Sequence, residues 1–176
     1  MTAAIDPLMD RFAIYRAVAT GLSAAQEADL RGLVRFLWLA SITTTERLIL
    51  RCAMRLVAEP SLRQRLRDEP ALVPAFVEEV LRLHPPEHMI PRVAAQPCAL
   101  AGQQIAAGDM VYLCMAAANR DPAVFSDPHA LRLDRRDNPH LSFGHGIHHC
   151  SGTGLARRIV PIAVRALVEP GQERFE

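Results

Sequence analysis

The sequence has little net charge, no paired-cysteine motif and no long uninterrupted apolar run. Its 176 residues include 20 Lys and Arg and 19 Asp and Glu, giving a net charge of +1 at pH 7. This balance argues against a basic surface for nucleic acid or acidic membranes, so neither partner is expected. The most apolar stretch, from Leu33 to Ile42, is interrupted by Arg35 and is too short to span a bilayer.

The N-terminal residues also lack an apolar core of signal-peptide length, so we expect a cytoplasmic protein. The four cysteines are widely separated and form no CxxC pair. In a reducing compartment such cysteines are free thiols more often than disulfides. They are Cys52, Cys98, Cys114 and Cys150.

Half of the residues are hydrophobic, and the length suits one domain with a packed core, taken as residues 1–176. Residues 8–20 have the period of a short amphipathic helix. Ser23 and Gln26 stand in capping-box positions before a second helix. This second helix is predicted over 24–58, where there is no proline.

Shorter elements follow. Helical periodicity covers 61–67 and 73–83, whereas glycine and β-favouring residues predict short strands between 93 and 115. The proline- and aspartate-rich stretch 119–142 predicts an ordered loop with turns. The predicted fold class is mainly α with small β hairpins.

A last helix is predicted from about Cys150 to Val168, and it contains Pro161. Proline lacks the amide hydrogen and crowds the preceding turn, at a cost of about 3 kcal/mol inside a continuous helix. We therefore expect this helix to be kinked or split.

The stretch FGHGIHHCSG, residues 143–152, gathers histidines, glycines and a cysteine. Cys150 stands where this loop enters the last helix, and free amides at a helix start stabilise a thiolate. Gly144, Gly146 and Gly152 permit positive φ and a close approach of backbone amides to the sulfur. The pattern is typical of a metal-ligating loop.

Zinc is one metal that this loop can serve. His145, His148 and Cys150 supply three ligands, and His140 or His149 supplies a fourth. Against zinc, the ligands form one short loop without a second cluster, and zinc leaves the glycine spacing unexplained.

The loop resembles FGxGxHxCxG, the heme-ligand motif of the cytochrome P450 family, and other family motifs accompany it in the same order. The resemblance covers about residues 23–168 and implies a truncated member that matches the C-terminal half. The accompanying segments are Ala40–Thr45 for AGxxTT, Glu79–Arg82 for ExxR, Pro91–Ala94, Asn119–Pro122 and Phe125–Pro128.

The resemblance implies heme b with Cys150 as its axial thiolate, so Cys150 is the metal ligand and a catalytic residue. His148 and Arg92 would bind the propionates. Phe143 would pack near the sulfur, whereas His140 is expected to be incidental. The implied heme-binding residues are Ala40, Arg92, Phe143, Gly144, His148, Cys150 and Gly152.

Thr44 would be catalytic on the distal side, beside the oxygen site, with Ala40 near the porphyrin face. Thr43 stands where the family usually has an acid, and Ser41 where it usually has a glycine. The acid–alcohol pair normally delivers protons, so its loss argues against ordinary oxygen activation. The other interpretation is that these hydroxyls bond back to the preceding helical turn.

Glu79 and Arg82 would form a buried structural pair. By position, the arginine or histidine that usually completes this network is missing, because Ala130 occupies its place and His129 is one residue away.

Family members are more than twice this length, so the resemblance implies a missing half that carries most of the substrate pocket. An exposed heme face predicts a homo-oligomer, or a partner chain that covers it. The resemblance implies an apolar small molecule as substrate, such as an intermediate of bacterial secondary metabolism.

Three functions follow from these residues. The first is a heme-thiolate enzyme that oxidises or desaturates its substrate with peroxide or oxygen, or that catalyses a redox-neutral rearrangement or cyclisation. The second is a non-catalytic heme-binding or helper protein for a partner enzyme. The third is a zinc-binding domain.

Overall fold

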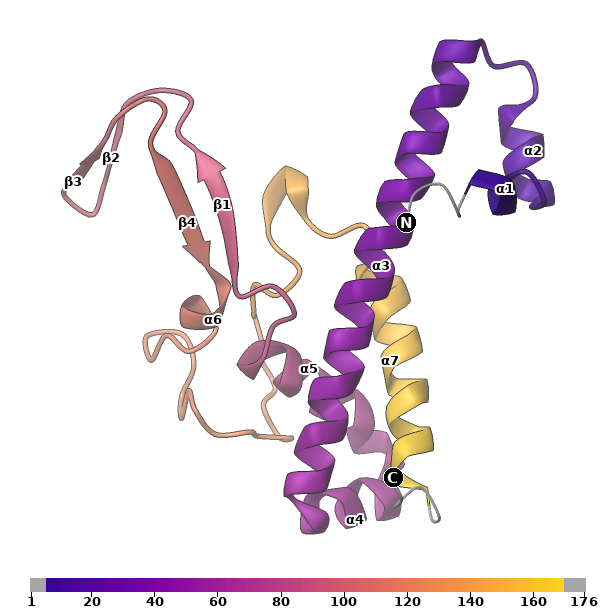
Figure 1. Ribbon diagram of the computed structural model, residues 1–176. Helices are drawn as coiled ribbons and strands as arrows, with labels where there is room; N and C mark the ends of the chain where they lie inside the picture. The colour runs from indigo at the N-terminus through magenta and orange to yellow at the C-terminus, as the bar shows by residue number, and fades with distance from the viewer. Residues whose placement is uncertain (1–5, 170–176) are drawn as a thin grey trace. The chain divides into compact units, whose positions relative to one another are not determined.

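The computed structural model describes residues 6–169, which are mainly helical with two small antiparallel sheets (Figure 1). This confirms the predicted fold class. The elements in chain order are α1 (Asp6–Met9), α2 (Ala13–Ala19), α3 (Ala24–Ala58), α4 (Pro60–Asp68), the 3₁₀ turn η2 (Pro70–Leu72), α5 (Val73–Leu83), β1 (Met89–Val93), β2 (Cys98–Leu100), β3 (Gln103–Ile105), β4 (Met110–Cys114), α6 (Met115–Ala118), the 3₁₀ turn η3 (Gly146–His148) and α7 (Thr153–Val168).

The described chain divides into two compact units, one reaching to Thr44 and the other starting at Thr45. The first holds α1, α2 and the N-terminal half of α3. The second holds the rest of α3 and all later elements. The assignment of residues 1–176 to one domain stays a prediction.

In the first unit, the single helix predicted over 8–20 is wrong, because α1 and α2 are separated by a turn. Ion pairs fix α1 and this turn to α3. Arg35 pairs with Asp6, and Arg31 Nη2 lies 2.8 Å from an Asp10 oxygen. These long-range pairs favour the turn over a continuous helix, and helical periodicity does not encode them.

The long helix α3 has the predicted bounds, Ala24–Ala58. Its start is the predicted capping box. The Ser23 amide donates to Gln26 Oε1 at 2.9 Å, and the Gln26 amide donates to Ser23 Oγ at 3.4 Å. Two amides without helical partners are thereby satisfied.

The core of the second unit is built from α3, α4, α5 and α7, and α5 and α7 lie side by side (Figure 1). Each helix contributes apolar residues at helical spacing, and these form one buried cluster. Its members are Leu48, Cys52, Leu56, Leu66, Val73, Phe76, Val77, Val80, Leu81, Val160, Val164 and Val168.

The last helix, α7, is one helix from Thr153 to Val168, so the expected split at Pro161 does not occur. Pro161 is buried with Val160 and Val164. The burial of this apolar face offsets the loss of one helical hydrogen bond.

Two nested hairpins lie outside this helical core (Figure 1). β1 pairs antiparallel with β4, so that Met89 faces Cys114, and β2 pairs with β3 at the tip. The turn between β2 and β3 has positive φ at Ala101 and Gly102. β1 begins at Met89, before the predicted strand region of 93–115.

Between β4 and the glycine-rich loop, the predicted ordered loop over 119–142 contains turns and bends but neither helix nor strand. Among the described residues, no helix is both long enough and apolar enough to cross a bilayer.

Candidate heme-ligand site

The segment from Phe143 to Gly152, here called the Cys150 loop, enters α7 by a tight path. Gly144 and Gly146 have φ of +72° and +71°, the left-handed region that glycine adopts without strain. The Cys150 amide donates to the Phe143 carbonyl at 2.8 Å and closes the loop. The two glycines therefore adopt the conformation that the sequence permits.

Gly152 is different, because it does not use the positive φ that a glycine permits, and its φ of −82° is open to any residue. A Cβ added there would lie 3.7 Å from the Cys150 sulfur, an ordinary contact. The chain continues directly into α7, which requires negative φ. Gly152 therefore leaves space beside the sulfur and does not make a turn.

The Cys150 side chain is exposed, while its main chain is held on both sides. Its amide donates to Phe143 as described, and its carbonyl accepts a bond of 2.7 Å from the Thr153 hydroxyl. The neighbouring Ile147 is 96% exposed, an unusual state for a large apolar side chain. The loop thus presents a thiol and an apolar side chain on a fixed backbone.

The other predicted heme neighbours lie in the same unit. His148 is exposed in η3, and Phe143 is partly buried against the helical core. Arg92 is exposed on β1, where its guanidinium donates to the Pro91 carbonyl at 2.8 Å. The chemistry of this donor set fits a heme, with a thiol for iron, apolar surface for the ring and cationic or hydrogen-bonding groups for carboxylates.

Ala40 and Thr44 belong to α3 in the first unit. The Thr44 hydroxyl donates to the Ala40 carbonyl at 2.7 Å, and the Thr43 hydroxyl donates to the Leu39 carbonyl at 3.1 Å. The alternative of bonding back to the preceding turn is therefore correct for both hydroxyls. Each hydroxyl oxygen keeps a lone pair that can accept a further proton donor.

Glu79 and Arg82 form a buried pair in α5, with 1% and 0% of each residue exposed. Arg82 Nε and Nη2 donate to the two Glu79 oxygens at 2.7 and 2.9 Å. Burial alone would raise the pKa of Glu79, but hydrogen bonds from Arg82 and the Arg132 amide lower it. The carboxylate is therefore ionised at neutral pH.

Arg82 also ties the ordered loop to α5. Its guanidinium donates to the Asn119, Pro128 and Ala130 carbonyls at 3.1, 2.7 and 2.8 Å. The charge is thus surrounded by acceptors, as a buried guanidinium requires.

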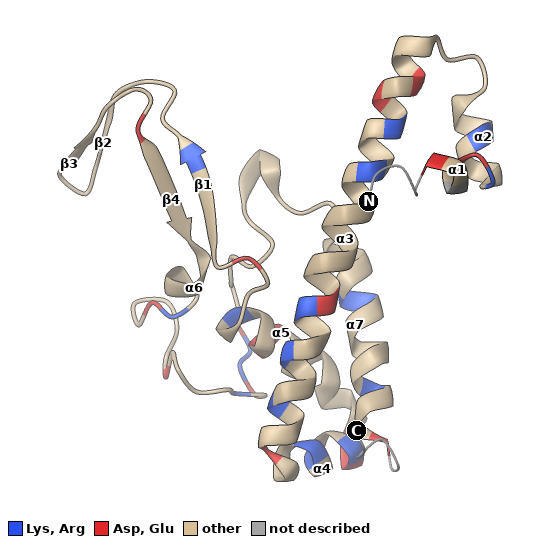
Figure 2. Cartoon of the chain, viewed as in Figure 1, with Lys and Arg blue, Asp and Glu red and all other residues tan. Residues whose placement is uncertain are grey.

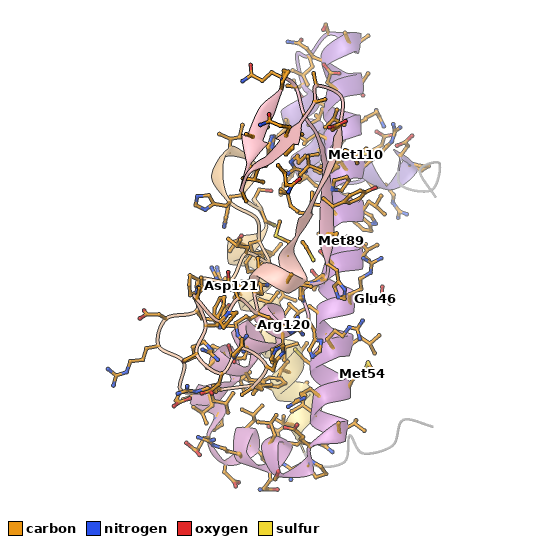
Figure 3. All side chains as sticks on the ribbon, turned by 90° about the vertical axis from the view of Figure 1, so that its left-hand side faces the viewer. Glu46, Met54, Met89, Met110, Arg120 and Asp121 are labelled. Atoms are coloured by element: carbon orange, nitrogen blue, oxygen red, sulfur yellow. The ribbon has the colours of Figure 1, made fainter. Side chains whose placement is uncertain are left out.

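Asn119 is a buried residue whose role the sequence does not reveal. Its side chain donates to Ser142 Oγ at 2.9 Å and accepts from the Leu141 amide at 2.7 Å. These bonds fix the segment just before the Cys150 loop. The next residue, Arg120 (labelled in Figure 3), donates to the Leu83 carbonyl at the end of α5.

A pocket of about 520 Å³ lies elsewhere in the second unit, between α3 and the start of β1. Met54 and Met89 (labelled in Figure 3) form part of its apolar lining. Arg47 and Arg51 line it as well, and Arg47 pairs with Glu87 at 2.7 Å. None of the predicted heme neighbours lines this pocket.

The model of the family described as "Cytochrome P450" matches residues 27–169. The chain belongs to the cytochrome P450 family. Cysteine-thiolate ligation of heme is characteristic of this family.

Individual P450s support the assignment. The "Biotin biosynthesis cytochrome P450" of Bacillus subtilis (strain 168) is 41% identical over 131 residues, which cover 74% of this chain and 33% of that protein. A crystal structure of P450 BioI with an acyl carrier protein ligated to hexadec-9Z-enoic acid matches with a TM-score of 0.72 at 41% identity, covering 76% of this chain and 35% of that one.

A mutant of the mixed-function P450 MycG in complex with mycinamicin V matches over more of the chain. The TM-score is 0.83 at 35% identity, and the match covers 95% of this chain and 45% of that one. The chain therefore spans between a third and just under half of the lengths of these P450s.

The expectation that the Glu79–Arg82 network lacks its last member is wrong. Arg135 Nε donates to Glu79 Oε1 at 3.0 Å, and Asn138 Nδ2 donates to the same oxygen at 3.1 Å. Arg135 lies five residues beyond Ala130, and only the folded path of the loop brings it back to α5. The burial of Arg135 could not be predicted from the sequence, because the residues around it are polar as well.

That His140 is incidental to the heme site stays a prediction, but its side chain is 1% exposed and bonds to Glu78 at 3.0 Å. Among residues 6–169, no group of three or more His, Cys, Asp or Glu side chains is placed to hold a metal ion. The geometry thus gives no support to a zinc site formed by His145, His148 and Cys150.

Proposed function

We propose that Cys150 is the axial thiolate ligand of a heme b, and that the chain is the heme-ligating part of an oxidative P450 enzyme. The observation that carries this proposal is the exposed thiol of Cys150 on a closed loop, beside the exposed Ile147. Membership of the family supports the same cofactor.

Several residues of the chain have distinct tasks in this proposal. The closed Cys150 loop holds the sulfur, and Gly152 leaves space beside it. His148 and Arg92 supply hydrogen bonds and positive charge to the propionates, and Phe143 supports the loop from the core side. When bound, a thiolate-ligated heme supplies the oxidising chemistry.

The substrate proposed is an apolar small molecule of bacterial metabolism. This rests on the relatives, which include a P450 of biotin biosynthesis, a P450 in complex with a fatty acid on an acyl carrier protein, and a P450 in complex with mycinamicin V. On the distal side, we propose that Thr44 accepts or relays a proton near the oxygen site, with Ala40 close to the porphyrin. The chain's Thr43 in place of an acid favours peroxide as the oxidant.

The test is the absorption spectrum of the hemin-reconstituted protein, reduced and exposed to carbon monoxide. Wild-type protein is expected to give the red-shifted band of a thiolate-ligated heme, and Cys150→Ser is expected to lose it. Cys98→Ser is the matched control, because Cys98 is also an exposed free thiol but lies in β2. A Cys150→Ser protein with an unchanged band, or stoichiometric zinc without porphyrin, would overturn the proposal.

Turnover then separates the enzyme from a non-catalytic helper. Heme-loaded protein is given hydrogen peroxide and a panel of fatty acids and macrolides, and products are measured by mass spectrometry. Oxygenated or desaturated products that require Cys150 support the enzyme. Binding spectra without any product support the helper role.

Self-association stays a prediction, and one surface favours it. α3 has an uncharged stretch between Arg35 and Glu46, seen as an unbroken tan section of the helix (Figure 2). On it Phe36 is 65% exposed, and Trp38 and Ile42 are more than 40% exposed. Burial of these side chains against a second copy of the chain would stabilise a dimer. Sedimentation velocity of wild type and Phe36→Glu tests this, with a dimer expected only for wild type.

A further inference from the structure

Glu78 precedes Glu79 in α5 but has a different set of partners. Its Oε1 accepts from Arg157 Nε at 2.9 Å, and its Oε2 accepts from Arg157 Nη2 at 2.8 Å. This two-bond geometry is the most directional way in which a guanidinium binds a carboxylate. It ties α5 to the first turns of α7, directly after the Cys150 loop.

His140 is the second partner of Glu78 and belongs to the segment before the loop. Its Nδ1 accepts from the Ser142 amide at 3.3 Å, so the ring proton lies on Nε2. Nε2 then donates to Glu78 Oε2 at 3.0 Å. One carboxylate therefore contacts both the segment that enters the loop and the helix that leaves it.

Phe143 lies between these two partners. Its ring centroid is 5.9 Å from that of His140, and the Arg157 guanidinium carbon lies 5.1 Å from the same Phe143 centroid. Both distances are within the range of attractive ring contacts. The Phe143 carbonyl in turn accepts the Cys150 amide at 2.8 Å. A continuous series of contacts thus joins Glu78 to the backbone of Cys150.

We propose that Glu78 is a positioning residue for the cysteine ligand. Through Arg157 and His140 it holds Phe143, and through the Phe143 carbonyl it fixes the Cys150 backbone. The Glu79–Arg82 network has different partners, which lie between Asn119 and Asn138. The relevance of Glu78 to heme rests on the proposed function, whereas its effect on the loop does not.

The first test needs no heme. Hydrogen exchange of the Cys150 amide is measured in the full chain for wild type, Glu78→Gln and Glu69→Gln. Glu69 is the matched control, since it forms an exposed ion pair with Arg65 at 3.4 Å. Glu78→Gln is expected to speed exchange at Cys150 about tenfold or more, the result of losing charge-assisted hydrogen bonds. Glu69→Gln is expected to leave it unchanged.

The pattern of exchange decides between positioning and mere stability. The proposal requires faster exchange in the Cys150 loop while amides of the core part of α5 keep wild-type rates. Equal acceleration in α5, or no change at Cys150, overturns it. If Glu78→Gln does not fold, Arg157→Lys removes the two-bond geometry while keeping the charge, and the same local pattern is required.

A second measurement connects the loop to the ligand. In hemin-reconstituted protein, Glu78→Gln is expected to increase the fraction of reduced carbonyl complex that lacks thiolate ligation. Unchanged ligation in Glu78→Gln overturns the role toward heme. Absence of thiolate ligation in wild type refutes the proposed function alone, because the exchange result stands without heme.

Discussion

The Glu79–Arg82 network and the Cys150 loop are two polar sites of the same unit with opposite solvent exposure. The network is almost fully buried, and Arg82 donates only to acceptors of the chain. In the loop, the main chain is bonded while Cys150 and Ile147 face outward. The buried site therefore supports the fold, whereas the exposed site leaves its side chains accessible to a ligand.

Among the substitutions considered, Arg82→Leu is expected to lower the free energy of unfolding the most. The substitution leaves the Glu79 carboxylate buried without its main partner and three loop carbonyls without a donor. The free energy of unfolding should fall by about 3–5 kcal/mol, the usual cost of breaking a buried ion pair. Urea denaturation followed by circular dichroism measures it.

Arg136→Leu is the control for this experiment, because Arg136 is exposed in the same run of the loop. Its free energy of unfolding should change by less than about 0.5 kcal/mol. Equal stability of the two variants would contradict the structural role of the network.

A smaller effect, dependent on pH, is expected for Glu78→Gln. Burial alone would raise the pKa of Glu78, but hydrogen bonds from His140 and Arg157 lower it to about 2. A carboxyl whose pKa is lower in the folded state stabilises the fold above its unfolded pKa, near 4.3. This contribution is lost as the pH falls from about 4 toward 2.

The free energies of unfolding of wild type and Glu78→Gln should therefore differ by about 2 kcal/mol at pH 7 and converge in acid. Denaturant titrations at several values between pH 7 and pH 3 measure the difference. Glu79 is present in both proteins, so its own titration largely cancels. A difference that is constant with pH would show that Glu78 does not act as a carboxylate.

Within the Cys150 loop, Gly144→Ala and Gly152→Ala should behave differently. Gly144 has φ of +72°, where a Cβ costs about 1–2 kcal/mol, whereas Gly152 has φ of −82°. Gly144→Ala should therefore lower the free energy of unfolding by about 1 kcal/mol, and Gly152→Ala should be near neutral without heme. With hemin added, weaker binding is expected for both, since an alanine Cβ at 152 lies beside the sulfur.

The accuracy of the sequence predictions follows the range of the interactions involved. The bounds of α3 depend on neighbouring residues and were predicted correctly, and Gly144 and Gly146 have the positive φ that their residue type permits. The burial of Arg135 and His140 was not predicted, because their partners Glu79 and Glu78 lie more than fifty residues earlier. Only the folded loop shows that these polar residues are buried.

The smallest effect is expected for Glu87→Gln, which isolates burial as the variable. Glu87 and Arg47 pair at 2.7 Å, the same distance as Glu79 and Arg82, but their side chains are 51% and 57% exposed. Exposed pairs are screened by water and contribute about 0–1 kcal/mol. Glu87→Gln should thus change the free energy of unfolding by less than about 0.5 kcal/mol, and less still at 1 M salt. If Glu87→Gln lowered the free energy of unfolding as much as Arg82→Leu does, burial would not determine how much an ion pair contributes to stability.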